Sequence, residues 1–418
     1  MLLGAIADDL TGATDLALTL SRGGMRVLQV VGVPSPDARF GDADAVVVSL
    51  KSRTIPAPEA VAMSVEAGKM LLAAGARQIF FKYCSTFDST NEGNIGPVID
   101  ALLELVGEAR TLACPAFPTN KRTVYKGHLF VGDLLISDSP MKDHPLTPMR
   151  DANLVRVLQR QTTRQVSLFD LDQVRAGAAP LGRSLDALNG IAIIDAINDD
   201  DLRTIGAAAA NLRLITGGSG VALGLPEVYR QAGLLHPVTP SHTLVAPEGR
   251  AAIIAGSCSA ATRRQIAVAQ AQGTPSLQVE AVDIADDRMS VASAADFVER
   301  HSRGLPPLVY SSADPDAIRA VQERLGRDHA GALVEHFMGQ LALALAQRGF
   351  TRFLVAGGET SGAVIQSLGV TTLQIGPEID PGVPWTLSSG EGPRLALALK
   401  SGNFGADDFF LKAWERLQ

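Results

Sequence analysis

Short apolar runs that alternate with alanine-rich runs limit the fold of this chain more than any other feature. The expected strands of the first half are Met1–Ile6, Met25–Val31, Ala43–Leu50, Gln78–Lys82, Arg110–Ala113, Tyr125–Val131, Gln165–Phe169, Ile191–Asp195 and Leu212–Thr216. The helices expected between them include Leu16–Arg22, Pro58–Ala74 and Ile95–Val106. Strands that alternate with helices indicate βαβ crossovers and therefore a mainly parallel sheet.

The alternation lapses once and then resumes. Between about Gly233 and Gly249 three prolines fall in a stretch without periodicity, which predicts a linker. A second α/β series begins with the strand Ala251–Ala255, and its expected helices are Ala260–Gln272, Ala292–Ser302 and Asp316–Arg348, the last broken near Gly331. The chain has 418 residues, beyond the roughly 250–300 that one core supports. We therefore expect an α/β fold of two domains, 1–235 and 250–418 with 236–249 as linker, each a mainly parallel sheet flanked by helices.

Composition excludes several classes of protein. Hydrophobic residues make up 46% of the chain and aromatics 5%, which is typical of a packed α/β enzyme rather than a disordered chain. The net charge is −7 and no block of Lys or Arg occurs, so neither nucleic acid nor a membrane surface is an expected partner. The N-terminus lacks a basic leader and no apolar run could span a bilayer, so we expect a soluble, cytoplasmic protein.

Two adjacent carboxylates follow the first expected strand. Asp8 and Asp9 lie where that strand ends and the next helix approaches. In open parallel sheets ligands bind beyond the carboxyl ends of the strands. Asp is also an ordinary helix cap, so the pair is interpreted either as a cap or as part of an active site.

Further polar residues follow other strands of the first half. Arg53 comes after the strand Ala43–Leu50, the segment Lys82–Thr90 ends the next strand, and Arg122 follows a third. If the sheet is parallel, these loops converge with Asp8 and Asp9 on one edge. Arg can grip a carboxylate through two parallel hydrogen bonds, so this edge suits a small, polyhydroxylated anion. The alternative for each cation is a solvated surface charge.

Glycine-rich turns follow strands in the second half. The stretch Phe353–Gly362 is expected to be a strand, a glycine turn and a helix start, and similar turns occur at Ala255–Ser259 and Lys400–Gly405. Turns without side chains let backbone N–H groups approach phosphate oxygens, and a helix N-terminus adds partial positive charge. None of the three is a G-x-x-x-x-G-K-[ST] or G-x-G-x-x-G motif. Together they predict a site for nucleotide phosphates.

Four stretches carry a resemblance to a known family. They are I-A-D-D-L-T-G-A-T-D at Ile6–Asp15, K-Y-C-S-T-F-D-S-T at Lys82–Thr90, G-G-E-T-S-G at Gly357–Gly362 and K-S-G-N-F-G at Lys400–Gly405. The chain resembles the four-carbon acid sugar kinase family nearly end to end. The resemblance implies a substrate domain, a nucleotide domain, and ATP-dependent phosphorylation of the C4 hydroxyl of a four-carbon sugar acid between them. The N-terminal stretch and the length favour 3-oxo-tetronate, although the motifs do not separate it from threonate or erythronate.

The resemblance also implies roles for individual residues. The ATP contacts would be Ser257, Gly358, Glu359, Thr360, Ser361 and Gly402, with Gly362, Lys400 and Asn403 beside them. The substrate would meet Asp8, Asp9, Arg53, Lys82, Ser85, Asp88 and Arg122. Asp9, or else Asp8, would take the hydroxyl proton. Mg²⁺ would bridge the phosphates, with at most one or two carboxylates such as Glu359 as protein ligands.

Two classes of protein other than a kinase stay open from the sequence. A non-catalytic sugar-acid binding protein would use the acidic edge without consuming ATP. A nicotinamide-dependent dehydrogenase would use the glycine turns for a dinucleotide, although no acidic residue follows a G-x-G-x-x-G motif at the distance that reads ribose. The assembly state is open, with a homodimer as one option.

Overall fold

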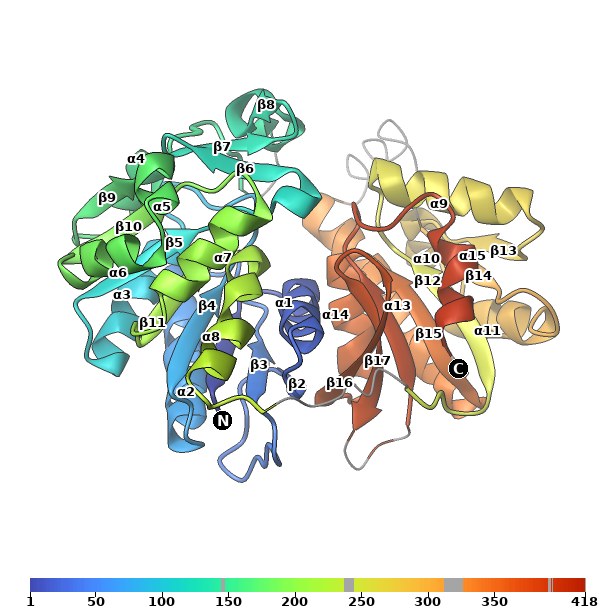
Figure 1. Cartoon of the computed structure of the whole chain (residues 1–418). Helices are drawn as coiled ribbons and strands as arrows, with labels where there is room; N and C mark the ends of the chain where they lie inside the picture. Colours follow the sequence, from blue (N-terminus) through green and yellow to red (C-terminus); the bar gives the residue numbers. More distant parts are fainter. Residues whose placement is uncertain (144–146, 237–243, 312–325, 390–391, 393, 418) are drawn as a thin grey trace. The chain divides into compact units, whose positions relative to one another are not determined.

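The structure is a computed structural model that describes residues 1–143, 147–236, 244–311, 326–389, 392 and 394–417. The chain divides into two compact units, Met1–Pro240 and Ser241–Gln418 (Figure 1). Of the expected linker, residues 237–243 lie outside the described residues. Each unit is described by itself below.

A parallel sheet forms the centre of the first unit. Its strands lie in the order β2-β3-β1-β4-β11-β5-β10-β9, and all neighbouring pairs are parallel. Their bounds are β1 Leu3–Ala7, β2 Val27–Val31, β3 Ala45–Ser49, β4 Gln78–Lys82, β5 Arg110–Cys114, β9 Val166–Phe169, β10 Gly190–Ile194 and β11 Leu214–Gly217. Every residue of β1, β3 and β4 is buried, which explains why these strands read as continuous apolar runs. The expected parallel sheet is confirmed.

Helices connect these strands and cover the sheet (Figure 1). Their bounds are α1 Leu10–Arg22, α2 Ala57–Ala73, α3 Ile95–Val106, α4 Leu154–Gln159, α5 Leu171–Arg175, α6 Ala178–Asp186, α7 Asp199–Ala208 and α8 Leu225–Gln231. Helix α2 packs against α3, whereas α1, α7 and α8 all contact the 3-10 helix Ser219–Gly224. Helix α1 begins six residues before the expected Leu16, because Asp9 caps it. The whole first turn of α1 therefore lies directly beyond the end of β1.

The expected strand Tyr125–Val131 is wrong, because the segment folds back on itself. Strands β6 (Arg122–Tyr125), β7 (His128–Val131) and β8 (Leu134–Leu135) form a small antiparallel sheet. The turn between β6 and β7 is Lys126-Gly127, with φ of 50° and 73°. Two residues with positive φ make the turn that suits a two-residue hairpin. Buried Asp195 accepts hydrogen bonds from both N–H groups, at 2.7 and 2.9 Å, and so fixes the turn.

The second unit has a mixed sheet in the order β13-β14-β12-β15-β18-β17-β16. The bounds are β12 Arg250–Ala255, β13 Ser276–Gln278, β14 Leu308–Tyr310, β15 Phe350–Ala356, β16 Thr372–Asp380, β17 Val383–Ser389 and β18 Ala396–Lys400. The pairs from β13 to β18 are parallel, whereas β17 runs antiparallel to both of its neighbours. The antiparallel strands were not predicted, but the sheet still places the ends of β12, β15 and β18 side by side.

The helices of the second unit are α9 Ala260–Ala271, α10 Ala281–Ala285, α11 Val291–Arg300, α13 Arg327–Gln347, α14 Gly358–Ser367 and α15 Phe409–Lys412. The expected break near Gly331 is wrong, because α13 continues through it. A single glycine costs a helix only about 1 kcal/mol, which 21 residues of helix absorb. Residues 316–325 of that expected helix lie outside the described residues. The α/β class is confirmed.

Among the described helices, none has both the length and the apolar character that crossing a bilayer requires.

Candidate active site

Asp9 in the first unit both caps a helix and faces a charged cluster. Its Oδ1 accepts a hydrogen bond from the Gly12 N–H at 3.1 Å, and its Oδ2 accepts one from Thr11 Oγ1 at 3.0 Å. The interpretation of Asp9 as an N-cap is therefore correct. This role does not exclude chemistry, because the same Oδ1 lies 2.8 Å from an Arg53 nitrogen.

Arg53 joins three carboxylates. Its Nε and Nη2 donate to the two oxygens of Asp8 at 2.9 and 2.8 Å, a bidentate pair. Its Nη2 also meets Asp9, and its Nη1 lies 3.7 Å from Asp88 Oδ2. The loop is fixed as well, since the Arg53 N–H donates to the Asp8 carbonyl and Asn94 Nδ2 donates to the Ser52 carbonyl. Arg53 thus organises Asp8, Asp9 and Asp88 into one cluster.

Lys82 completes this cluster from the last position of β4. It is buried, and its Nζ lies 3.7 Å from Asp9 Oδ1. The ammonium fills the space that a side chain at residue 12 would need, because a Cβ on Gly12 would overlap both Lys82 Nζ and Asp9 Oδ1. Gly12 was not among the expected site residues. The glycine is part of the motif at Ile6–Asp15, but the sequence does not show that the space beside it is filled by the Lys82 ammonium.

The acidic groups of the cluster differ in their affinity for protons. Burial raises the pKa of Asp8 despite the Arg53 charge. Burial also acts to raise the pKa of Asp9, but Arg53, Lys82 and the cap hydrogen bonds bring it down to about 2. Burial raises the pKa of Asp15, a neighbour on α1, to about 6. The Asp9 side chain is 26% exposed and that of Asp8 only 6%, so Asp9 is the more accessible acid.

Ser85 and Arg122, two of the expected substrate residues, make no hydrogen bond or ion pair with Asp8, Asp9, Lys82 or Asp88 among the residues that the structure describes. Ser85 is half-buried in the turn after β4. Arg122 donates through Nη1 to the Asn120 carbonyl and, within the described residues, makes no ion pair with Asp8, Asp9 or Asp88. The structure therefore joins the loops that carry Asp8, Arg53, Lys82 and Asp88. It does not join the loop of Arg122 to them by any described contact.

In the second unit the three glycine turns meet, because β12, β15 and β18 are neighbours. A Cβ on Gly402 would overlap Ser257 Oγ, which places the third turn against the first. A Cβ on Gly256 would overlap Thr360 Oγ1, which places the first turn against the start of α14. Gly357 at that start has φ of 127°, a conformation that favours glycine. The backbones of the three turns therefore lie close to one another and form one surface.

The start of α14 offers backbone donors to this surface. Its N-cap is Gly357, which has no side chain to accept from the first turn. Gly358 and Glu359 are exposed there, whereas Thr360 and Ser361 are buried and Gly362 is half-buried. The N–H groups of a helix's first turn have no partner within the helix and favour anions. This turn can therefore hold phosphate oxygens through its backbone.

Lys400 lies beneath the third turn and is 0% exposed. Its Nζ donates to Thr262 Oγ1 at 3.0 Å, the Ser401 carbonyl at 3.1 Å and the Gly402 carbonyl at 2.8 Å. Burial lowers the pKa of this lysine to about 7. Thr262 and its neighbour Ser259 were missed from the sequence, because nothing in their spacing shows that they reach a loop about 140 residues later.

The described residues hold no group of three or more His, Cys, Asp or Glu that could bind a metal ion. Mg²⁺ in nucleotide sites takes most of its ligands from phosphates and water, with one or two carboxylates from the protein. Glu359, exposed at the start of α14, fits that limited part.

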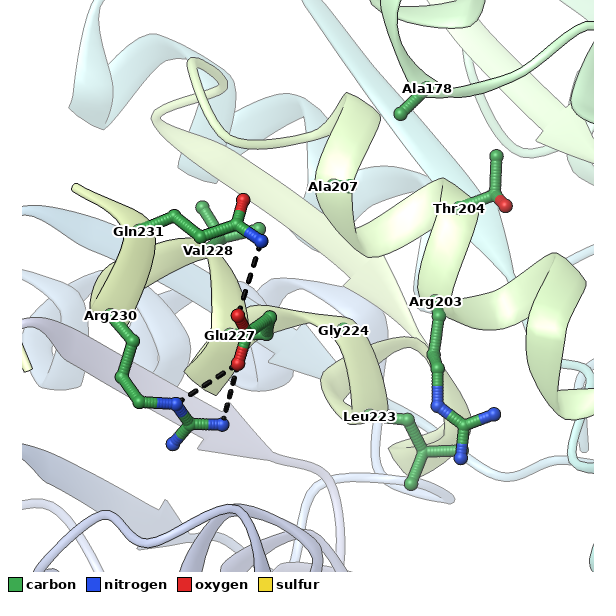
Figure 2. Close-up of a pocket in the computed structure, with 10 residues that line it drawn as sticks. All are labelled: Ala178, Arg203, Thr204, Ala207, Leu223, Gly224, Glu227, Val228, Arg230 and Gln231. Atoms are coloured by element: carbon green, nitrogen blue, oxygen red, sulfur yellow. Dashed lines mark hydrogen bonds and ion pairs between the residues drawn. The ribbon is translucent and has the colours of Figure 1, made fainter. Parts of the chain in front are cut away.

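The first unit also contains a hollow (Figure 2). It is lined by residues of the α6 to α8 region, among them Arg203, Glu227 and Arg230. Glu227 accepts from Arg230 Nε at 3.0 Å and from Gln231 Nε2 at 3.1 Å, so its carboxylate is already engaged. None of the expected site residues lines this hollow.

Comparison with known proteins identifies the class. A sugar-binding N-terminal domain matches residues 3–225, and a nucleotide-binding C-terminal domain matches residues 252–410. The chain belongs to the four-carbon acid sugar kinase family, and the resemblance seen in the motifs is confirmed.

Relatives match over nearly the whole chain. The 3-oxo-tetronate kinases of Burkholderia multivorans and Cupriavidus necator are each 53% identical, over 100% of this chain and 97% of theirs. The crystal structure of a Salmonella typhimurium protein is similar with a TM-score of 0.88 and 40% identity, over 100% of this chain and 99% of that one. That protein was provisionally described as a tRNA synthase.

Proposed function

We propose that the protein is a kinase that transfers the γ-phosphoryl group of ATP to the C4 hydroxyl of 3-oxo-tetronate. The observation that carries this proposal is the pair of built sites: a charged cluster around Asp9 and Arg53 in the first unit, and three converging glycine turns in the second. The names of the relatives at 53% identity support this substrate. The matched nucleotide-binding domain supports ATP as the donor.

Asp9 is the proposed acceptor of the hydroxyl proton. The C4 oxygen bonds to the γ-phosphorus, the bond from phosphorus to the β,γ-bridging oxygen breaks, and the hydroxyl proton passes to Asp9. A pKa of about 2 makes Asp9 a weak base, which suits phosphoryl transfer because a loose transition state needs alignment more than strong proton abstraction. Asp8 is the alternative base, but its greater burial and its bidentate bond to Arg53 favour a supporting role.

Lys82 and Arg53 are the proposed cations for the substrate. The contacts of Arg53 with Asp8, Asp9 and Asp88 leave Lys82 as the cation with the looser pairing, 3.7 Å from Asp9. We therefore propose that Lys82 takes the larger part of the charge on the reacting group and that Arg53 fixes the acids. Ser85, Asp88 and Arg122 remain proposed contacts for the hydroxyls and the carboxylate of the substrate.

The second unit is the proposed phosphate holder. Backbone N–H groups at Gly358, Glu359 and Thr360 would bind the phosphates, with Ser257, Ser361, Gly362, Gly402 and Asn403 around them. When bound, Mg²⁺ neutralises charge on the phosphates, and Glu359 would be its protein ligand. Transfer requires the nucleotide and the sugar acid to meet during the reaction. An active site between the two domains, a homodimer and a cytoplasmic location stay predictions.

The experiment that tests the proposal is a coupled assay of ADP release with a panel of four-carbon acids. We expect turnover with 3-oxo-tetronate to exceed turnover with D-threonate and D-erythronate. Preferential turnover of one of those two would replace the substrate and keep the kinase. Binding of an acid without any ADP release would favour a sugar-acid binding protein, and reduction of a nicotinamide cofactor would favour a dehydrogenase.

A further inference from the structure

The unusual feature of the second unit is a fully buried lysine, Lys400. Lys400 ends β18 and makes no ion pair with a carboxylate in the part of the chain that the structure describes. Burying an unpaired charge costs free energy unless its hydrogen bonds are satisfied. Here three neutral oxygens accept hydrogen bonds from the ammonium, so all three of its N–H donors are satisfied within the protein.

Two of those oxygens are consecutive backbone carbonyls, and the Ser401 carbonyl also accepts from the Phe404 N–H at 3.1 Å, so the ammonium and this turn hydrogen bond together orient the loop. Lys400 Nζ donates to the Ser401 carbonyl at 3.1 Å and to the Gly402 carbonyl at 2.8 Å. In a trans peptide the C=O of one residue and the N–H of the next point in opposite directions. Drawing both carbonyls inward therefore turns the N–H groups of Gly402 and Asn403 outward, where Gly402 is half-exposed and Asn403 exposed.

Side-chain hydroxyls reinforce the same orientation. Ser259 Oγ donates to the Gly402 carbonyl at 2.6 Å, and Thr262 Oγ1 lies 2.9 Å from it. Ser259 is itself the N-cap of α9, so the loop is tied to a rigid element. The Gly402 carbonyl is thus held from three sides.

We infer that Lys400 builds an anion-binding nest at Gly402 and Asn403, by drawing the two carbonyls onto its buried ammonium so that both N–H groups face a phosphate of the nucleotide. Successive outward N–H groups form a concave site for anions. The positive charge behind the loop adds attraction that the backbone alone lacks, in surroundings of low dielectric constant. Lys400 is then a positioning residue that does not touch the ligand. This inference rests on the proposed function, because it refines how the nucleotide is held.

The test compares phosphate binding with nucleoside binding in the full chain. Lys400→Met keeps the length of the side chain but removes the donors and the charge. We expect its affinity for ATP and for inorganic tripolyphosphate, measured by calorimetry, to fall at least tenfold, while the affinity for adenosine changes less than twofold. Lys412→Met is the matched control, since Lys412 is a half-buried lysine of the same unit that pairs with Asp380 and Asp408 instead of with the Lys400–Gly405 turn. We expect it to bind tripolyphosphate like the unaltered protein.

The inference is overturned if Lys400→Met binds tripolyphosphate normally, or if adenosine and tripolyphosphate lose affinity in equal proportion, as a general structural defect would produce. If Lys400→Met does not fold, Thr262→Val gives the same test through a near-isosteric change, with an expected three- to tenfold loss for tripolyphosphate alone. Tripolyphosphate binding needs no sugar acid. A protein that turns over no four-carbon acid would therefore refute the proposed function without deciding the role of Lys400.

Discussion

The two candidate sites are built from different materials. In the first unit, charged side chains carry the site: Asp8, Asp9 and Asp88 surround Arg53, and Lys82 stands beside them. In the second unit, the candidate site consists mainly of backbone. Its three turns approach closely because Gly256, Gly357 and Gly402 lack side chains. The difference follows from the proposed ligands. A small acid with hydroxyls is read by directed side chains, whereas a phosphate is held by an array of N–H groups.

The largest expected effect is that of Asp9→Asn, which should lower kcat and leave ATP binding in the second unit unchanged. Asp9→Asn keeps an acceptor for the cap but cannot take up the hydroxyl proton as a carboxylate does. We expect kcat to fall by about 10²–10⁴, the usual contribution of a general base. The measurement is steady-state ADP release, with ATP binding followed by calorimetry as the control. A loss in kcat of less than tenfold would assign the proton to Asp8 or to solvent.

A pair of glycine variants sharpens the comparison. Gly12→Ala forces Lys82 and Asp9 aside, so we expect KM for the sugar acid to rise about ten- to a hundredfold with KM for ATP unchanged. Gly402→Ala pushes against Ser257, so we expect the reverse. Gly331→Ala is the control, because the space around Gly331 is open and alanine favours a helix interior. If both variants raised the same KM, the two sites would not be separate in function.

The smallest expected effect is on stability and again concerns Lys400. Its pKa of about 7 in the folded protein lies below the ordinary 10.5, so between these values the unfolded chain binds more protons than the folded one. The free energy of unfolding therefore gains a contribution that rises with pH from about 7 to about 10. We expect urea unfolding at pH 7 and pH 9 to show this rise in the unaltered protein and in Lys412→Met. Lys400→Met should lack it, and parallel behaviour of all three would contradict the burial of a titrating lysine.

The sequence predicts regular elements well where local pattern decides them. Strand β4 (Gln78–Lys82) and helix α3 (Ile95–Val106) match their expected bounds to the residue. The hairpin at Lys126 was missed, because a lysine with positive φ has no local signal and its turn is fixed by Asp195, 69 residues away. The local sequence pattern therefore predicts which residues form strands and helices, but it does not predict contacts between residues that are far apart in the sequence.

Chain direction also predicts part of the arrangement of the candidate site. The loops of Asp8, Arg53, Lys82 and Asp88 converge as a parallel sheet requires, since chain direction alone places strand ends together. The pairing inside the cluster could not be predicted, because the spacing of Arg53 in the sequence does not show that it pairs with Asp8, Asp9 and Asp88. The same holds for Lys400, since the last residue of a strand can point to either face.

The space shared by Gly12 and Lys82 links two positions that are 70 residues apart in sequence. Replacement of Gly12 is constrained while Lys82 is present, because any side chain at residue 12 displaces the Lys82 ammonium. Loss of Lys82 alone would not admit a side chain at residue 12, because a Cβ there would still overlap Asp9 Oδ1; larger residues are expected at this position only where both Lys82 and Asp9 have been replaced. In a related sequence, replacement of all of these residues would indicate that the proposed chemistry has been lost.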